Sequence, residues 1–231
     1  GKYSNYCPSA TLKNALYLDL ETKEFVYLSS MKKPRSRITS VIVNDRFYVF
    51  EQNPSDKEDF CEVYNIKDNF WHPLRNPIPD LLAHPCVVAD ERYIYVTGKF
   101  QEESFLQKYD TRDKKWHVRE KTKGLRKCSL IKLDLDNGSA SYHAKKIYIC
   151  NGKIMYVYDT RKKVWIYRQH KFEHKVKNFQ ICRRGITISV VGGENEDGSL
   201  TNGCLEFWNE SKHPHWNCYR SNKPFGFLQF P

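Results

Sequence analysis

The sequence predicts an all-β fold of propeller type with about five four-stranded blades. Three observations lead to this prediction: an aromatic pair recurs at a fixed spacing, the pair recurs at a regular period, and each period holds several apolar runs of strand length. The two members of each pair are seven positions apart. The pairs are Tyr64 and Trp71, Tyr109 and Trp116, and Tyr158 and Trp165.

Weaker copies extend this unit toward both ends of the chain. Leu18 and Phe25 are again seven positions apart, while Phe207 and Trp216 are nine apart, as though two residues had been inserted. The five units start at positions 18, 64, 109, 158 and 207, so the intervals are 46, 45, 49 and 49 residues. A regular period of this length is typical of a repeat architecture.

Each period contains runs suited to three or four β-strands, with no convincing helical pattern. The second period shows CVV, then YIYVTG, then FLQKYDT, and a fourth run, WHVRE, opens at the tryptophan. The Asp, Asn, Thr and Lys residues between the aromatics suit a turn, which the aspartate can cap through the turn's own backbone. We therefore expect the tyrosine and the tryptophan on successive strands, with their rings between neighbouring blades and their polar tips hydrogen-bonded.

The predicted repeats cover residues 26–71, 72–116, 117–165 and 166–216. Residues 1–25 would supply the later strands of one further blade, and residues 217–231 its first strand. Closing that blade with strands from both termini would leave no exposed sheet edge. The chain begins without a methionine or a leader, so we expect it to be a piece of a longer protein.

Composition favours a globular protein without membrane segments. The 231 residues are 40% apolar and 14% aromatic, in short runs, whereas a bilayer span needs about 20 continuous apolar residues. The eight cysteines show no CxxC and no paired Cys/His spacing, which argues against a zinc site or a disulfide framework. We expect most of them to be buried thiols of a cytoplasmic or nuclear protein. N-glycosylation patterns at Asn137 and Asn209 leave a secreted origin open.

The net charge of +11 predicts an acidic partner, because clustered cations concentrate anions and speed their encounter. Nucleic acid is not the partner we expect. The basic runs are interrupted by acidic residues such as Asp113 and Glu120, and no RNA-binding or DNA-binding motif accompanies them.

On these residues the chain resembles the kelch-repeat propellers over essentially its whole length. A kelch blade carries a hydrophobic strand ending in two glycines, then a Tyr-Asp unit and a tryptophan, at a period of about 50 residues. The fullest copy is TISVVGGENEDGSLTNGCLEF, with Gly192 and Gly193 at the double-glycine positions, and residues 31–50 resemble the opening of a kelch repeat. The other repeats carry Glu51-Gln52, Gly98-Lys99 and Asn151-Gly152 at the glycine positions. Kelch domains more often have six blades, so a ring that has lost part of its N-terminal region is the alternative.

The resemblance implies a non-catalytic protein-interaction module. In the commonest animal and poxviral kelch architecture, BTB and BACK domains precede the propeller, and the whole resembles a substrate adaptor of a cullin-RING E3 ubiquitin ligase. The ligase would bind through the missing N-terminal region, and this domain would select a substrate with an acidic motif. One alternative is an actin-binding cytoskeletal scaffold, and another is a kelch enzyme with a metal in its channel.

We expect no catalytic residues, no cofactor and no metal. The Gly-rich phosphate loop, G-x-S-x-G and H-E-x-x-H are absent from the sequence, so the common signatures of phosphate, acyl and zinc chemistry are missing. The histidines are scattered over all repeats, and the close pair His213 and His215 lies in the inserted turn.

Partner-binding residues are expected on the end faces, where loops from successive blades form one continuous surface. In kelch domains that capture acidic peptides, the second arginine of a PRxR segment is often a contact residue, and Arg37 matches it here. Arginine can bind a carboxylate through two parallel hydrogen bonds. Loosely matching positions in the other repeats are His84, Arg126 or Lys127, and Lys175 or Lys177.

A second basic ring is expected at the turns between the first two strands of each blade. Its members are Arg46, Arg92, Arg183 and Arg184. For any one of these residues the alternative is a solvated hairpin tip.

Overall fold

The computed structural model describes residues 12–35, 38–52, 54–100, 103–117, 139–143, 145–150, 155–168, 179–184, 187–191, 193–195, 197–199, 203–208 and 216–220. Within these ranges the chain forms 18 strands and no helix. The prediction of an all-β chain is confirmed.

Four antiparallel four-stranded sheets follow one another along the chain, each in the order of its sequence. Sheet 1 contains β3 (Ile38–Val43), β4 (Arg46–Glu51), β5 (Cys61–Asn65) and β6 (Phe70–Pro73). Sheet 2 contains β7 (Ala83–Ala89), β8 (Tyr93–Phe100), β9 (Glu103–Asp110) and β10 (Lys115–His117). Sheet 3 contains β11 (Ser139–His143), β12 (Lys146–Cys150), β13 (Met155–Asp159) and β14 (Val164–Arg168). Sheet 4 contains β15 (Gln180–Arg184), β16 (Thr187–Val191), β17 (Gly203–Trp208) and β18 (Trp216–Arg220).

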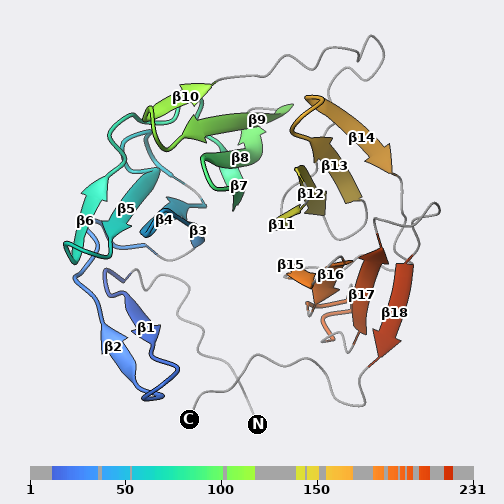
Figure 1. Ribbon diagram of the computed structural model, residues 1–231, viewed down its shortest axis with the longest axis horizontal. Coiled ribbons are helices and arrows are strands. Elements are labelled where there is room, and N and C mark those ends of the chain that lie inside the picture. Colours follow the sequence, from blue (N-terminus) through green and yellow to red (C-terminus); the bar gives the residue numbers. More distant parts are fainter. Residues whose placement is uncertain are drawn as a thin grey trace.

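A two-stranded N-terminal sheet, β1 (Leu16–Leu18) and β2 (Phe25–Tyr27), precedes these four. Figure 1 shows all five sheets around a common centre, with β3, β7, β11 and β15 innermost and β6, β10, β14 and β18 outermost. Inner strands of successive sheets contact one another. Residues 217–220 belong to β18, which corrects the prediction that they start the closing strand. Residues 1–11 and 221–231, on which closure depends, lie outside the described residues.

The recurring aromatic pairs are cross-strand partners between the third and fourth strands of each sheet. The register opposes Tyr64 to Trp71, Tyr109 to Trp116, Tyr158 to Trp165, and Phe207 to Trp216. The ring centroids of the three Tyr/Trp pairs are 5.2, 5.1 and 5.1 Å apart. Leu18 and Phe25 are partners in the N-terminal sheet in the same way. The spacing of seven residues is therefore set by the turn that joins the third strand to the fourth.

The residue after each tyrosine, Asn65, Asp110 or Asp159, caps the turn by accepting hydrogen bonds from the turn's backbone. Asp110 Oδ1 accepts hydrogen bonds from the N–H groups of Arg112 and Asp113, at 3.0 and 3.2 Å. Asp159 Oδ1 does the same in sheet 3, with the N–H groups of residues 161 and 162 at 3.0 and 2.9 Å. Each turn ends in a left-handed residue, Lys114 and Lys163, with φ of 54° and 56°. The turn chemistry thus recurs together with the aromatic pair.

The tryptophan side chains also connect neighbouring sheets. Trp71 Nε1 donates to the carbonyl of Ser29 at 2.7 Å, and Trp116 Nε1 donates to the carbonyl of Asn76 at 2.8 Å. Both acceptors lie in the segment that leads into the sheet of that tryptophan, about one repeat earlier in the chain. The outermost strand is therefore tied to the linker from the preceding sheet.

Three clusters of the core each bridge two neighbouring sheets. Sheets 1 and 2 share a cluster that includes Phe50, Phe60, Ile94 and Val96. Further clusters join β7 and β8 to β11–β13, and β12 and β13 to β15 and β16. Because each core lies between sheets, no sheet buries its apolar faces alone.

Gly98 in β8 lies where the chain leaves no room for a side chain. A Cβ atom there would stand 2.8 Å from the Ala83 carbonyl oxygen and 2.8 Å from Leu82 Cβ. We expect Gly98→Ala to destabilise the protein by about 1–3 kcal/mol, because backbone must move to admit the methyl group. The control is Gly198→Ala, which meets nothing within 4 Å and is strained only by its φ of 80°. Urea unfolding that shows equal losses for both variants would contradict this account.

Candidate functional site

A cavity of about 290 Å³ lies where the inner strands begin. We call it the inner-strand cavity. Strands β3, β7, β11 and β15 all contribute residues from their first half, so matching positions of four sheets meet at one place. Its lining residues are Ile38, Thr39, Ser40, Gln52, Pro85, Cys86, Val87, Ala140 and Gln180.

A buried ion pair fixes the segment that leads into this cavity. Arg35 Nη2 lies 3.0 Å from Glu62 Oε1, and the two residues are only 5% and 2% exposed. Glu62 also accepts the backbone N–H groups of Lys32 and Lys33, at 2.7 and 3.0 Å. A second carboxylate, Glu51, lies 3.4 Å from Arg35 Nη1. Residues 32–35 are therefore held against sheet 1, mainly through Glu62 and also through Glu51.

His84, one of the predicted contact residues, lies beside the cavity in a strained conformation. Its φ is 49°, within a register irregularity between Ala83 and Cys86. Its N–H donates to the carbonyl of Gln52 at 2.8 Å, which connects β7 to the loop of sheet 1. A left-handed histidine inside a strand persists only where its surroundings fix it. The residue that follows, Pro85, lines the cavity.

The other residues predicted at this end fall outside the described part of the chain. They are Arg37, Arg126, Lys127, Lys175 and Lys177. Gly192 is also outside it, while Gly193 has a φ of 106°, which only glycine adopts readily. Gln52 was not predicted from the sequence as a residue of the cavity lining. The signal was present, because Gln52 stands where the kelch pattern has a glycine and therefore adds a polar side chain there. The pairing of Arg35 with Glu62 was not predicted either, and it has no local signal.

The predicted second basic ring is revised at Arg92. The turns of sheets 1 and 2 do contact each other, since Asn44 Nδ2 donates to the Glu91 carbonyl at 3.3 Å. Arg92 Nη2, however, lies 2.6 Å from Asp110 Oδ2 and 3.2 Å from Asp113 Oδ2. Its charge is therefore occupied within sheet 2. Arg183 and Arg184 end β15 at the matching turn, and Arg46 begins β4.

Asp110 should make stability depend on pH through this ion pair. Burial acts to raise the pKa of Asp110, but hydrogen bonds from Arg92 and from turn N–H groups outweigh it and hold that pKa below its usual value. A carboxylate with a lowered pKa stabilises the fold above its unfolded pKa, and this contribution is lost as pH falls through the folded pKa. We expect Asp110→Asn to cost about 2 kcal/mol at pH 7, and less below the ordinary pKa of 3.8.

Urea unfolding at pH 7 and pH 3 measures this difference. Asp159→Asn is the matched control, because Asp159 caps the equivalent turn and forms no ion pair with any described residue. Its loss should be smaller at pH 7. An Asp110→Asn penalty that is the same at both pH values would exclude the charge of Asp110 as its cause.

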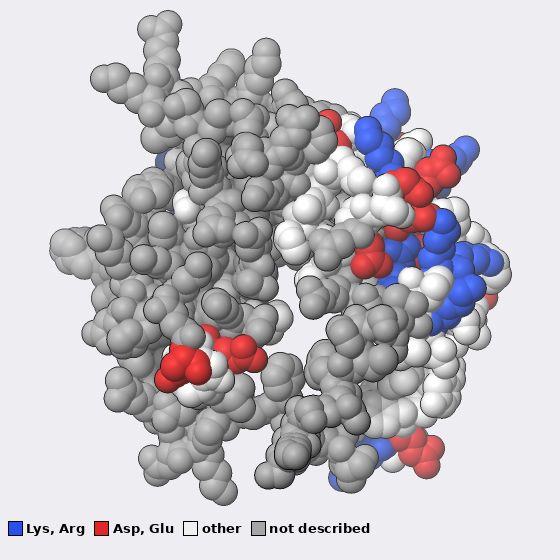
Figure 2. Space-filling view, turned by 180° about the vertical axis from the view of Figure 1, so that it is seen from behind, with Lys and Arg blue, Asp and Glu red and all other residues white. Residues whose placement is uncertain are grey.

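Charged side chains gather along the margin that carries sheet 1, where Lys and Arg are interspersed with Asp and Glu (Figure 2). Several of them neutralise one another. Lys33 pairs with Asp59, and Arg35 pairs with Glu62 and Glu51. These ion pairs leave the net charge of +11 unchanged, but they engage the cations that form them. Cations without a carboxylate partner among the described residues are therefore the better candidates for binding an acidic ligand.

Three cysteines, Cys61, Cys86 and Cys150, are buried free thiols, in line with the prediction made for most of the cysteines. Burial raises the pKa of Cys86 to about 12 and also raises that of Cys61.

Across the described ranges, no three His, Cys, Asp or Glu residues are grouped to hold a metal ion. His213 and His215 lie outside those ranges. Within the described residues, no helix is long and apolar enough to cross a bilayer.

Comparison with known proteins supports the fold alone. No family model and no curated protein matches this chain. Among solved structures, the chain is similar to YjhT, with a TM-score of 0.66 at 16% sequence identity, over 85% of this chain and 68% of that one. At 16% identity this similarity supports the β-sheet-rich architecture and says nothing about activity.

Proposed function

We propose that this chain is a kelch-type β-propeller that recognises proteins and catalyses no reaction. The observation that carries the proposal is the inner-strand cavity, to which four successive sheets contribute matching positions. Thr39, Ser40, Gln52 and Gln180 give its lining hydrogen-bonding groups suited to a peptide. The net charge of +11 favours an acidic peptide, because complementary charge speeds encounter and selects the partner.

Arg37 is the proposed contact for a carboxylate of that peptide. It follows the anchored Arg35 by two positions and immediately precedes Ile38, which lines the cavity. His84 and one basic residue from each of the pairs Arg126/Lys127 and Lys175/Lys177 are the proposed neighbours. An arginine at this position can bind a carboxylate through two hydrogen bonds.

By its resemblance to BTB-kelch proteins, we propose that the domain selects substrates for a cullin-RING E3 ubiquitin ligase in the cytoplasm. The ligase would be held by an N-terminal region outside this chain. Actin binding and metal-dependent catalysis remain the competing proposals. Co-sedimentation with filaments would favour the first of these, and stoichiometric bound metal the second.

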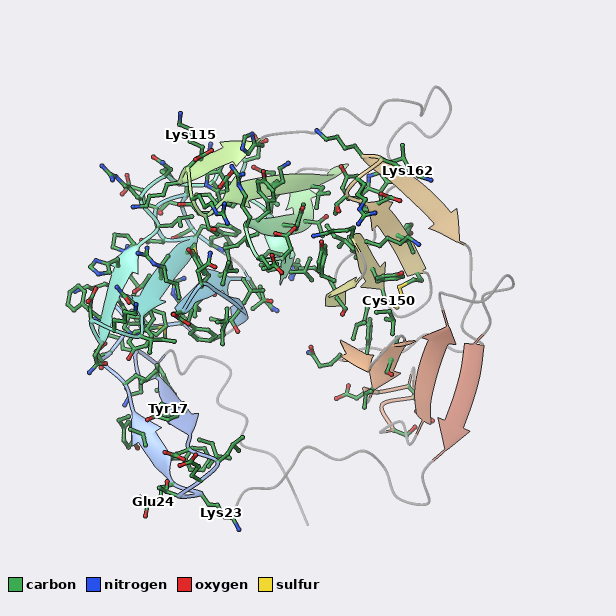
Figure 3. All side chains as sticks on the ribbon, in the orientation of Figure 1. Tyr17, Lys23, Glu24, Lys115, Cys150 and Lys162 are labelled. Atoms are coloured by element: carbon green, nitrogen blue, oxygen red, sulfur yellow. The ribbon has the colours of Figure 1, made fainter. Side chains whose placement is uncertain are left out.

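The test is affinity purification from cells with the wild-type chain beside the Arg37→Glu, Arg126→Glu variant. The matched control is Arg112→Glu, Lys162→Glu, which changes the net charge equally but alters exposed turn residues; Lys162 lies at the outer margin of sheet 3 (Figure 3). We expect acidic partners to be lost with the first variant and retained with the control. Equal recovery with all three proteins would refute recognition at the Arg37 end.

We further propose that strands from both termini close a fifth blade around β1 and β2. A two-stranded sheet is marginally stable alone, and Leu16, Tyr17, Phe25 and Tyr27 in this one are exposed. Deleting residues 221–231 should therefore lower the thermal midpoint by several degrees, since apolar cover is lost. An unchanged midpoint, measured by calorimetry, would argue against closure by the C-terminal segment.

A further inference from the structure

A second concave site lies between sheets 1 and 2, at the opposite end of the strands. It has a volume of about 450 Å³, and we call it the intersheet cleft. Arg46 in its lining pairs with Val43 at the turn of the β3–β4 hairpin, whereas Ile38 of the inner-strand cavity pairs with Glu51 at the hairpin's other end. The two sites therefore share no residue and face different ends of the molecule.

The floor of the intersheet cleft is apolar. It is formed by Tyr48, Val63, Leu74 and Tyr109, all buried members of the core that joins the two sheets. Pro73 extends it at the edge. The floor belongs to the buried core, and the volume of the cleft is in the range of known small-ligand sites, about 300–1,000 Å³.

The rim of the cleft is cationic, and its cations have no carboxylate partner in the described part of the chain. Arg46, Arg75 and Lys114 line it and are exposed, and none of them forms an ion pair with a described residue. In this they differ from Arg92, which two aspartates neutralise. His72 lies on the same rim, and Asp68 is the one carboxylate of the lining.

Arg46 is placed so that its charge reaches the floor. Burial raises the pKa of both Tyr48 and Tyr109, the latter to about 12, and the nearby charge of Arg46 opposes the rise at both phenols. Asp68 is engaged by Asn65, whose amide donates to its Oδ2. The cleft thus combines an apolar floor with cations that have no carboxylate partner among the described residues. Lys33 and Arg35, also near sheet 1, are instead paired with carboxylates.

We propose that the intersheet cleft binds an acidic peptide segment in which an apolar side chain neighbours a carboxylate. The apolar side chain would cover the floor, and the carboxylates would contact Arg46 and Arg75. Burial of the apolar group supplies affinity, and the guanidinium groups supply preference for a carboxylate. This goes beyond the proposed function, because it uses none of the residues of the Arg37 end.

The test is isothermal titration calorimetry with the full chain and three capped tetrapeptides: Ac-Asp-Phe-Glu-Leu-NH2, Ac-Asp-Gly-Glu-Gly-NH2 and Ac-Lys-Phe-Lys-Leu-NH2. The first should bind about tenfold more tightly than either of the others, because it alone has both chemistries. Arg46→Glu, Arg75→Glu should weaken its binding by about tenfold or more. The matched control, Arg112→Glu, Lys115→Glu, alters exposed residues outside the cleft lining and should leave affinity within about twofold.

Three results would overturn the proposal. The first is equal weakening by the two double variants, which would mean that binding follows net charge alone. The second is loss of binding with Arg37→Glu but not with Arg46→Glu, Arg75→Glu, which would place the peptide at the inner-strand cavity. The third is binding of the dye 8-anilinonaphthalene-1-sulfonate at the cleft without binding of the peptide, which would make it a site for small aromatic anions. Near-ultraviolet circular dichroism of every variant excludes misfolding as the cause.

Discussion

Replacing Glu62 with alanine is expected to destabilise the protein by about 3–5 kcal/mol, because the Arg35 charge would remain buried without its main partner. The side chains of Arg35 and Glu62 are 2% and 3% exposed, so water cannot take the place of the carboxylate. The N–H groups of Lys32 and Lys33 would also lose their acceptor. Urea unfolding followed by tryptophan fluorescence measures the loss.

Glu58→Ala is the control for this prediction, since Glu58 is exposed in the loop before β5; its cost should be within about 0.5 kcal/mol of zero. The double variant Arg35→Met, Glu62→Leu should recover part of the stability, because removing both charges leaves no buried arginine without its partner. Recovery should be incomplete, because the N–H groups of Lys32 and Lys33 still lack their acceptor. If Glu62→Ala lowers the free energy of unfolding by less than about 1 kcal/mol, this ion pair is no stronger than an exposed one and the prediction is wrong.

Replacing Trp71 with alanine should cost a similar amount, about 3–5 kcal/mol. Trp71 is 1% exposed and packs against Tyr64 and Phe47, with ring centroids at 5.2 and 6.2 Å. Its indole N–H also ties β6 to the carbonyl of Ser29. The substitution therefore leaves a cavity and removes a link between sheet 1 and the chain that enters it.

Trp116→Ala is the informative comparison, because Trp116 forms the same pair and the same type of hydrogen bond but is only half-buried. Its cost should be smaller by about 1 kcal/mol or more. Equal losses for the two variants, measured by urea unfolding, would mean that the hydrogen bond and not the buried area determines stability.

The repeat was predictable because its signals are local. Tyr109, Asp110 and Trp116 lie on one strand-turn-strand unit, so their spacing reports directly on the cross-strand register and the turn. The turn hydrogen bonds that Asp110 accepts come from residues two and three positions away. Sequence reasoning could therefore place these residues without knowing how the sheets pack.

The candidate sites were less predictable because their partners are distant in the sequence. Arg35 contacts Glu62, 27 residues further along the chain, and the His84 N–H donates to the carbonyl of Gln52 in sheet 1. Arg92 belongs to the same class, since Asp110 neutralises it from another strand. Sequence composition treats Arg46 and Arg92 alike. In the structure Arg92 is paired with Asp110 and Asp113, whereas Arg46 forms no ion pair with a described residue.

The links from Trp71 and Trp116 end on main-chain carbonyls of Ser29 and Asn76. A carbonyl oxygen is present whichever amino acid occupies the position, so mutation of the linker cannot delete the acceptor. Residues of these linkers can thus be exchanged while the attachment of the outermost strand persists. The linkers around Ser29 and Asn76 are therefore positions where evolution or protein design can change the sequence and keep the attachment of the outermost strand.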